Sequence, residues 1–364
     1  MTTYLFAGGG TAGHVNPLLA TADRLRERER DARVLVLGTA EGLEARLVPA
    51  RGYELLTIPR LPFPRRPGAA ALRFPGAIRA SIDRTASLME EHAVDAVVGF
   101  GGYASAPAYL AARRLGTPIA IHEQNARPGL ANRLGARLTD HVGVAFAGTR
   151  LRGARVVGMP LRREIERLDL AAARAAAFDI FELDPLKPTL LVTGGSTGAR
   201  SINRTLAAAI PALLGTGWQV LHIAGERDAL ADPGLAGYRL LAYCDRMELA
   251  LSIADLAVSR AGATTASELA ALGIPAVYIP YPVGNGEQRV NAREAVHAGG
   301  AILVSDAEFT PEWAQTSLVA LLEDRASVAE MAARMVGVGR RDGADRMVDL
   351  LLEAVGGAGA GTVG

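Results

Sequence analysis

Short apolar runs alternate with longer amphipathic stretches along most of the chain. The first series of predicted strands comprises TYLFA (3–7), ARVLVLG (32–38), DAVVGFG (95–101), TPIAIHE (117–123) and HVGVAF (141–146). The second series comprises TLLVTGG (189–195), WQVLHIAG (218–225), LAVSRAG (256–262), PAVYIPY (275–281) and AILVS (301–305). Strands of this kind separated by helices are typical of parallel sheets covered on both faces. The pattern therefore predicts two doubly wound α/β domains.

The two series meet near the sequence VVGMPLRREI, residues 156–165. We expect a first domain over 1–160, a second over 161–338, and a C-terminal helix over 339–355 that packs back on the first domain. The tail 356–364, GGAGAGTVG, has no hydrophobic pattern and is expected to be disordered. Ligands of open α/β sheets bind outside the carboxyl ends of the strands, so two facing domains would form one cleft.

Composition excludes several classes of protein. The 364 residues carry a formal net charge of +1, so no overall field attracts nucleic acid. The single cysteine, Cys244, permits no intrachain disulfide, and the N-terminus lacks a signal-peptide pattern. The longest uncharged stretch, 205–225, is interrupted by Pro211 and two glycines and does not predict a membrane span. No metal-ligand spacing is present, so no metal site is expected.

Three glycine clusters follow predicted strands: GGGTAGH (8–14), GFGGYASAP (99–107) and GGSTGAR (194–200). Glycines at strand ends simply allow tight turns, but three such junctions also favour binding of phosphate or sugar. The first cluster matches G-x-G-x-x-G, yet the strand 32–38 ends without the acidic residue that holds the ribose of NAD. A P-loop is excluded because no Gly-Lys-Ser/Thr sequence is present.

The segment 259–291 contains the richest chemistry. We expect a strand to end at Ser259 and a helix to begin near Thr265, with N-terminal amides able to hold a diphosphate. Glu268 is placed to accept both ribose hydroxyls, although Thr265 and Glu268 also fit a capping box that needs no ligand. Gln288 and Asn291 could bind sugar hydroxyls or cap the following helix.

Seven segments in family order span nearly the whole chain and resemble the MurG family of bacterial transferases. They are GGTAGHVNP, GGYASAP, HEQNARPGLAN, VVGMPLR, GGSTGAR, SRAGATTASELAALGIPAVYIP and GEQRVNA. The resemblance implies the GT-B fold, two Rossmann-like domains facing across a cleft. It also implies inverting transfer of N-acetylglucosamine from UDP-N-acetylglucosamine to the 4-hydroxyl of lipid I, the undecaprenyl-diphosphate-linked muramoyl-pentapeptide. No cofactor and no bound metal are implied.

The product of that reaction is lipid II for peptidoglycan synthesis, so the resemblance implies roles in cell-wall biogenesis, cell shape and cell division. It implies a peripheral enzyme on the cytoplasmic face of the bacterial membrane, and it allows contacts with other cell-wall synthesis proteins. Two other functions remain open from the residues alone. One is a UDP-sugar epimerase of the same fold, and the other is a sugar-nucleotide-binding protein without catalysis.

The resemblance also implies roles for individual residues. The uridine is expected on the Cys244 backbone beside Tyr243 and Met247, and Gln288 is expected to bind the sugar. The diphosphate and ribose are assigned to Ala263, Thr264, Thr265, Ala266, Ser267 and Glu268, with Arg162 and Ser196 near the phosphates. The N-terminal side of the donor site is assigned to Thr11, Ala12, Gly13 and Asn125. The acceptor diphosphate loop is assigned to Gly9, Gly10, Gly102 and Tyr103.

The catalytic residues implied are His14 and Glu123, both facing the acceptor. A neutral His14 could take the proton of the attacking hydroxyl, or it could instead cap a helix or bind phosphate without proton transfer. Glu123 is the alternative base, and His122 is expected to be structural. The chain departs from the family at Ala12, which replaces a usual glycine of the first loop.

Arginines and apolar residues are interleaved over 60–84. We define the arginine/apolar patch as Phe63, Arg66, Arg73, Phe74, Ile78 and Arg79. Apolar side chains rimmed by arginine suit an anionic bilayer surface, and the lipid-linked acceptor implies membrane attachment through this domain. The alternative is an ordinary solvated arginine face.

Overall fold

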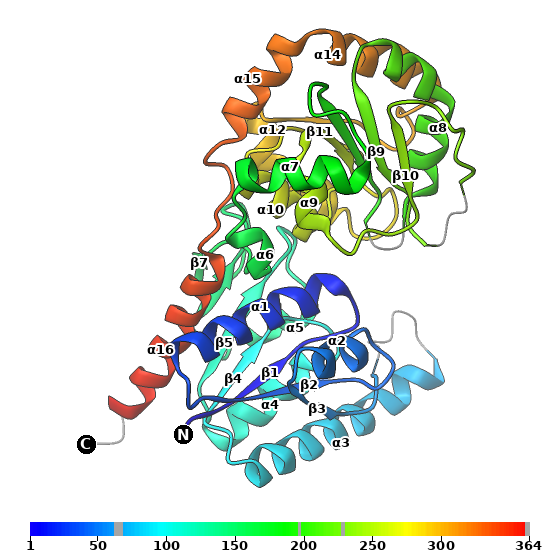
Figure 1. Cartoon of the computed structure of the whole chain (residues 1–364). Helices are drawn as coiled ribbons and strands as arrows, with labels where there is room; N and C mark the ends of the chain where they lie inside the picture. Colours follow the sequence, from blue (N-terminus) through cyan, green and yellow to red (C-terminus); the bar gives the residue numbers. More distant parts are fainter. Residues whose placement is uncertain (62–67, 196–197, 227–229, 361–364) are drawn as a thin grey trace. The chain divides into compact units, whose positions relative to one another are not determined.

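The computed structural model describes residues 1–61, 68–195, 198–226 and 230–360 (Figure 1). The chain divides into two compact units. Unit 1 contains residues 1–162 together with the C-terminal segment from 341, and unit 2 contains 163–340. The unit boundaries therefore fall after 162 and 340, where the sequence predicted 160 and 338.

Unit 1 contains, within these ranges, a seven-stranded parallel sheet in the order β3-β2-β1-β4-β5-β6-β7. Its strands are β1 (Thr3–Ala7), β2 (Arg33–Gly38), β3 (Glu54–Thr57), β4 (Ala96–Gly99), β5 (Ile119–Glu123), β6 (Val142–Val144) and β7 (Ala154–Val156). The strand order reverses between β1 and β4, which makes the carboxyl ends of these two strands the topological switch point.

Helices cover both faces of this sheet. They are α1 (Ala12–Arg28), α2 (Glu44–Ala50), α3 (Ala69–Glu91), α4 (Ser105–Leu115), α5 (Leu130–Gly135) and α16 (Gly343–Ala360). Tyr4 and Phe6 of β1 pack with residues of α1 and α16, whereas Leu5 and Ala7 pack with residues of α3 and α4. Because successive side chains of a strand point to opposite faces, an uninterrupted apolar run buries both sides of the sheet.

The C-terminal helix α16 packs against α1 of the same unit (Figure 1). Ion pairs join them, with Arg24 3.1 Å from Asp345 and Arg28 2.7 Å from Asp349 and 3.9 Å from Asp345. The helix continues to Ala360, so the expectation of a disordered segment is wrong for 356–360. This last part contains Gly356, Gly357 and Gly359, whose helix propensity is low, so its continuation depends on the earlier turns of α16 that pack in the core of unit 1. Residues 361–364 lie outside the described part of the chain.

Unit 2 contains, over its described residues, a six-stranded parallel sheet in the order β10-β9-β8-β11-β12-β13. Its strands are β8 (Thr189–Thr193), β9 (Gln219–Ile223), β10 (Tyr238–Leu241), β11 (Ala254–Ser259), β12 (Ala276–Tyr278) and β13 (Ala301–Leu303). The switch point lies between β8 and β11, in the same topological place as in unit 1.

The described helices of unit 2 begin with the single turn of α6 and end with α13, η1, α14 and α15, which follow one another closely along the chain. They are α6 (Arg163–Glu166), α7 (Leu170–Phe181), α8 (Arg200–Gly215), α9 (Met247–Ser252), α10 (Ala263–Leu272), α11 (Glu287–Asn291), α12 (Arg293–Ala298), α13 (Pro311–Trp313), the π-helix η1 (Ala314–Leu318), α14 (Val319–Glu323) and α15 (Arg325–Met335). Leu190 and Val192 of β8 pack against Ile202 and Leu206 of α8 in the core. This packing places the end of β8 and the start of α8, which flank the third glycine cluster, at the switch point.

Candidate functional site

Two glycine loops of unit 1 contact each other at the switch point. The first follows β1 and the second follows β4. A Cβ built on Gly102 would lie 2.5 Å from the carbonyl oxygen of Gly9, so only glycine permits this approach of the two backbones. Gly10 and Gly102 also have positive φ, 90° and 84°. The four residues predicted to form the acceptor loop are therefore neighbours in space, with Tyr103 following Gly102 along the second loop.

His14 lies in the first turn of α1, directly after the first loop. Its Nδ1 is 3.0 Å from Oγ1 of Thr11, and its partly exposed ring lies over Gly101, where a Cβ would be 3.1 Å from Cδ2. Burial lowers the pKa of His14, which keeps the imidazole neutral near pH 7. The N-cap of α1 is Thr11, so the alternative that His14 caps this helix is wrong.

Glu123 is buried at the end of β5, with only 2% of its surface exposed. Its Oε1 accepts a hydrogen bond from the Asn125 amide at 2.9 Å. Its Oε2 accepts from the Gly129 amide at 2.9 Å and from Nδ2 of Asn132 at 3.0 Å. Burial raises the pKa of Glu123, and these hydrogen bonds oppose the rise. Both carboxylate oxygens therefore accept hydrogen bonds, and Glu123 holds the turn over 125–129 in place.

His122, the preceding residue of β5, is completely buried. Its Nε2 lies 2.9 Å from the carbonyl oxygen of Gly158, and burial lowers its pKa to about 4. This contact links β5 to the segment that ends unit 1.

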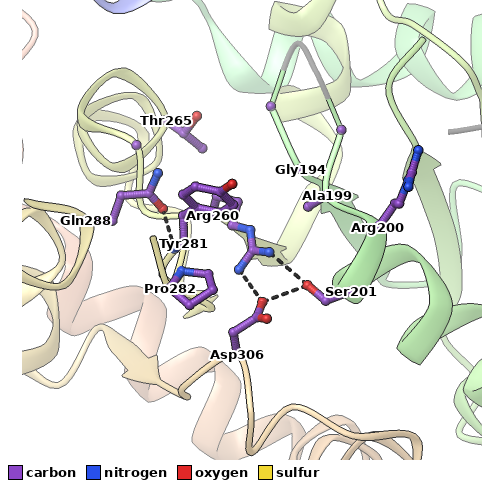
Figure 2. Close-up of a pocket in the computed structure, with 13 residues that line it drawn as sticks. Gly194, Ala199, Arg200, Ser201, Arg260, Thr265, Tyr281, Pro282, Gln288 and Asp306 are labelled. Carbon is purple, nitrogen blue, oxygen red and sulfur yellow. Dashed lines mark hydrogen bonds and ion pairs between the residues drawn. The ribbon is translucent and has the colours of Figure 1, made fainter. Parts of the chain in front are cut away.

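Unit 2 has a pocket of about 620 Å³ at its own switch point (Figure 2). Three turns at the carboxyl edge of the sheet supply most of its lining. The lining residues are Gly194, Gly195, Gly198, Ala199, Arg200, Ser201, Arg260, Gly262, Thr265, Tyr281, Pro282, Gln288 and Asp306. Of the predicted donor residues, Thr265 and Gln288 meet here, beside the third glycine cluster.

Helix α10 presents its N-terminus near this pocket. The helix begins at Ala263, and its N-cap, Gly262, has no side chain to accept the first amides. Thr265 is therefore the third helical residue, so the capping-box interpretation of Thr265 and Glu268 is wrong. Glu268 lies further along the same helix, after Ala266 and Ser267, and is 6% exposed. The buried hydroxyl of Thr264 has no hydrogen-bond partner among the described residues. Uncapped amides at a helix N-terminus suit an anionic ligand.

An arginine at the end of β11 organises the pocket wall (Figure 2). Arg260 donates from Nη1 to Oδ1 of Asp306 at 2.6 Å and from Nη2 to Oγ of Ser201 at 2.8 Å. Its guanidinium carbon lies 5.5 Å from the ring centroid of Tyr281. A role for Arg260 is not evident from the sequence, because its partners Asp306 and Ser201 are 46 and 59 residues away along the chain.

The side-chain oxygen of Gln288 binds within the protein, whereas its side-chain nitrogen can donate to a ligand. Its Oε1 accepts from the Tyr281 amide at 2.9 Å, which leaves the carboxamide nitrogen as a donor. Asn291 is 2% exposed and donates from Nδ2 to the carbonyl oxygen of Ala261 at 3.2 Å. Asn291 therefore connects α11 to the β11–α10 turn, as a structural residue.

Several other predicted donor residues are not among the residues that line this pocket. Tyr243 and Cys244 occupy the connection from β10 to α9, and Met247 is the first residue of α9. Arg162 is the last residue of unit 1 before the chain enters unit 2. Ser196 lies outside the described residues. Across the described residues, no group of three or more His, Cys, Asp or Glu side chains could hold a metal ion.

The arginine/apolar patch is described only in part, since Phe63 and Arg66 lie outside the described residues. Arg73 and Arg79 are exposed on α3, whereas Phe74 and Ile78, one turn apart, are partly buried. Leu72 beside them is 85% exposed. Over the ranges that the structure describes, no helix is both long enough and apolar enough to span a bilayer.

Two family models match most of the chain. The glycosyltransferase family 28 N-terminal domain matches residues 4–144, and the glycosyltransferase family 28 C-terminal domain matches residues 189–347. The chain belongs to glycosyltransferase family 28. It is therefore a glycosyltransferase.

Curated members of this family resemble the chain over nearly its full length. The protein named UDP-N-acetylglucosamine–N-acetylmuramyl-(pentapeptide) pyrophosphoryl-undecaprenol N-acetylglucosamine transferase of Leifsonia xyli is 66% identical over 351 residues, 96% of this chain and 98% of the relative. The protein of the same name from Clavibacter sepedonicus is 61% identical, over 98% of this chain and 97% of the relative.

Solved structures agree with this assignment. The crystal structure of Acinetobacter baumannii MurG matches with a TM-score of 0.80 and 29% identity, covering 97% of this chain and all of that one. The predicted fold class, the GT-B fold with two Rossmann-like parallel-sheet domains, is confirmed. A UDP-GlcNAc 2-epimerase from Neisseria meningitidis matches with a TM-score of 0.68 at 14% identity, a likeness of fold alone.

Proposed function

We propose that this family 28 glycosyltransferase transfers N-acetylglucosamine from UDP-N-acetylglucosamine to the 4-hydroxyl of lipid I, giving lipid II. The observation that carries the proposal is the 66% identity, over nearly the full length of both chains, to a relative that is named for this transfer. The 2-epimerase that shares the fold is only 14% identical, so it gives no comparable support for epimerisation.

Unit 2 provides the donor side of the proposed reaction. The uncapped amides of α10 would bind the diphosphate, and Glu268 would accept the ribose hydroxyls. The free carboxamide nitrogen of Gln288 would donate to a sugar hydroxyl. The uridine would lie on the Cys244 backbone with Tyr243 and Met247 beside it, in the connection before α9. Arg162 and Ser196 would lie near the phosphates.

Unit 1 provides the acceptor side. With the Nδ1 hydrogen of His14 donated to Oγ1 of Thr11, Nε2 carries the lone pair that accepts a proton. As the 4-hydroxyl oxygen bonds to the anomeric carbon, its proton passes to Nε2 of His14, and the bond from that carbon to the diphosphate oxygen breaks. The negative charge on the departing UDP is stabilised by the α10 amides and Arg162. Inversion follows from attack on the face opposite the leaving group.

Because the proposed acceptor is lipid-linked, we infer that the reaction takes place at a membrane, and we propose the cytoplasmic face, where the enzyme would be peripheral. Peripheral attachment would use the arginine/apolar patch, of which Arg73 and Arg79 are exposed and Leu72 presents an adjacent apolar side chain. Anionic lipids are the partner that this combination fits.

The test is incubation with labelled UDP-N-acetylglucosamine, with and without a short-chain lipid I analogue. We expect a disaccharide product that forms only when the acceptor is present. Conversion of the donor to its 2-epimer without acceptor would overturn the proposal in favour of an epimerase. UDP binding without either reaction would favour a sugar-nucleotide-binding protein.

A further inference from the structure

Glu44, the first residue of α2, is a carboxylate enclosed beneath the first glycine loop. Only 1% of its surface is exposed, which is rare for glutamate unless its oxygens are hydrogen-bonded. Its Oε2 accepts from the Gly10 amide at 2.7 Å. Its Oε1 accepts from the amide and the hydroxyl of Thr39, at 3.0 and 2.8 Å. One side chain therefore connects the loop after β1 to the end of β2.

Three glycines create the space that this carboxylate occupies. A Cβ on Gly9, Gly38 or Gly42 would lie 2.3, 2.5 or 2.0 Å from atoms of the Glu44 side chain. Real Cβ atoms do not approach other atoms so closely, so any side chain at these positions would displace Glu44. The glycines come from the β1 loop, the end of β2 and the turn before α2, and they enclose Glu44 from three directions.

The charge of Glu44 is retained in this enclosure. Burial acts to raise its pKa, but the hydrogen bonds from Gly10 and Thr39 outweigh burial and lower the pKa overall. The side chain is therefore ionised at neutral pH, and its hydrogen bonds are of the stronger, charge-assisted kind. The same charge acts to raise the pKa of His14, against the lowering by burial.

The contacts of the first loop continue from Glu44 to His14. Glu44 contacts the backbone at Gly9 and Gly10, and Gly9 contacts Gly102 of the second loop. The ring of His14 lies against Gly101, the neighbour of Gly102. The position of the imidazole therefore depends on two backbone segments, one of which Glu44 fixes directly.

We propose that Glu44 is a positioning residue for the acceptor side of the reaction: by fixing the Gly10 amide, it sets the loop from which His14 extends toward the acceptor. The proposal rests on the proposed function, in which this loop faces the acceptor and His14 is the base. It gives the buried carboxylate a role distinct from substrate contact.

The decisive variant is Glu44→Gln. Glutamine has one side-chain oxygen, so its NH₂ group must face the Gly10 amide or the two Thr39 donors, and at least one hydrogen bond is lost. We expect acceptor-dependent kcat/KM to fall by about 10- to 100-fold, as small displacements of a catalytic group can cost about 10²-fold. The Kd for UDP should stay within twofold, since the uridine, ribose and diphosphate are assigned to residues of unit 2 that Glu44 does not contact.

Two further variants separate positioning from general damage. Thr39→Ala removes one donor to the same carboxylate and keeps the Gly10 hydrogen bond, so we expect activity within threefold of wild type. Gly42→Ala keeps the charge of Glu44 but places a Cβ where Oε2 lies, so it should reproduce the loss seen with Glu44→Gln. Equal losses in Thr39→Ala and Glu44→Gln would overturn the proposal.

Hydrogen exchange gives a readout that does not depend on the reaction. Amides over 8–14 should exchange faster in Glu44→Gln than in wild type, while amides over 189–195 of unit 2 should be unchanged. Unchanged exchange over 8–14, or wild-type kcat/KM in a folded Glu44→Gln variant, overturns the positioning role. If the wild-type protein forms no disaccharide, the proposed function fails, while the exchange comparison still decides whether Glu44 fixes the loop.

Discussion

The hydroxyl oxygen of Thr11 lies 3.0 Å from Nδ1 of His14, across the first turn of α1. In the proposed mechanism Nδ1 donates this hydrogen bond, which orients the ring and leaves Nε2 free to accept a proton. Thr11→Val keeps the shape of the side chain and removes the oxygen. We expect kcat to fall by about fivefold, the equivalent of one hydrogen bond worth about 1 kcal/mol.

Thr11→Ser is the matched control, because it keeps the hydroxyl. Steady-state turnover at saturating donor and acceptor should place it near wild type. A Thr11→Ser variant as slow as Thr11→Val would point to packing of the threonine methyl group, and the hydrogen bond would lose its assigned role.

His14 itself is tested by two substitutions. His14→Ala should lower kcat by about 10²–10⁴-fold, the usual range for a lost general base, with UDP affinity unchanged. His14→Asn keeps a hydrogen-bonding side chain that cannot take up a proton, so it should be equally slow. Near-normal turnover of His14→Asn would assign His14 to phosphate positioning.

The pH profile gives a second measurement of the same residue. Burial lowers the pKa of His14, so kcat should decline only as the pH falls through a value below 6.5, where the imidazole becomes protonated. This acidic limb should be missing from the residual activity of His14→Asn. An unchanged limb in that variant would assign the titration to another group.

Glu268 is expected to bind the ribose of the donor. Because charge-assisted hydrogen bonds to hydroxyls would be lost, Glu268→Ala should weaken UDP binding by about 2 kcal/mol, about 30-fold in Kd. Isothermal titration calorimetry measures this directly. Unchanged UDP affinity with a lowered melting temperature would show that Glu268 has a structural role only.

The ion pair of Arg260 with Asp306 is largely buried, with the two side chains 11% and 22% exposed. Asp306→Ala should lower the free energy of unfolding by about 2 kcal/mol, less than the 3–5 kcal/mol typical of breaking a completely buried pair. Chemical denaturation measures the change. Glu330→Gln, which breaks the exposed pair of Glu330 with Arg334, is the control and should leave the midpoint nearly unchanged. Similar effects of the two variants would contradict this prediction.

Arg73 and Arg79 should contribute to binding at an anionic membrane. Each arginine near such a surface is worth about 1 kcal/mol, so the double change Arg73→Glu and Arg79→Glu should weaken binding by at least about 30-fold. Vesicle flotation measures binding, and turnover of a water-soluble acceptor should be preserved. Arg152→Glu, an exposed position outside the patch, is the control. If wild type, the double variant and the control bind vesicles equally, the arginine/apolar patch does not contact the membrane.

The sequence predicted the strands that are buried on both faces, because their apolar runs are continuous. It did not predict the edge strands β3, β7 and β10, which have partly exposed side chains; Val156 of β7 is 41% exposed. The edge strand β13 was predicted, because AILV is a continuous apolar run. Strands that bury little apolar surface carry little hydrophobic pattern.

The glycine junctions were predictable because each is a local pattern, in which a strand, a turn and a helix follow one another in the sequence. Contacts between residues far apart in the sequence could not be predicted. Glu44 is 34 residues from Gly10, and Arg260 is 46 residues from Asp306. The hydrogen bonds that both oxygens of Glu123 accept from Asn125, Gly129 and Asn132 could not be predicted either, because they depend on the conformation of the turn after β5.

Helix α16 has a consequence for how the protein is made. The apolar side chains of α1 are covered in part by Met347, Leu350 and Leu351, which are synthesised after the whole of unit 2. Unit 2 is a continuous segment and can fold as it is synthesised, whereas the core of unit 1 is complete only once α16 has followed unit 2 out of the ribosome. A nascent or prematurely terminated polypeptide therefore exposes a hydrophobic surface on its N-terminal half, the kind of surface that chaperones bind.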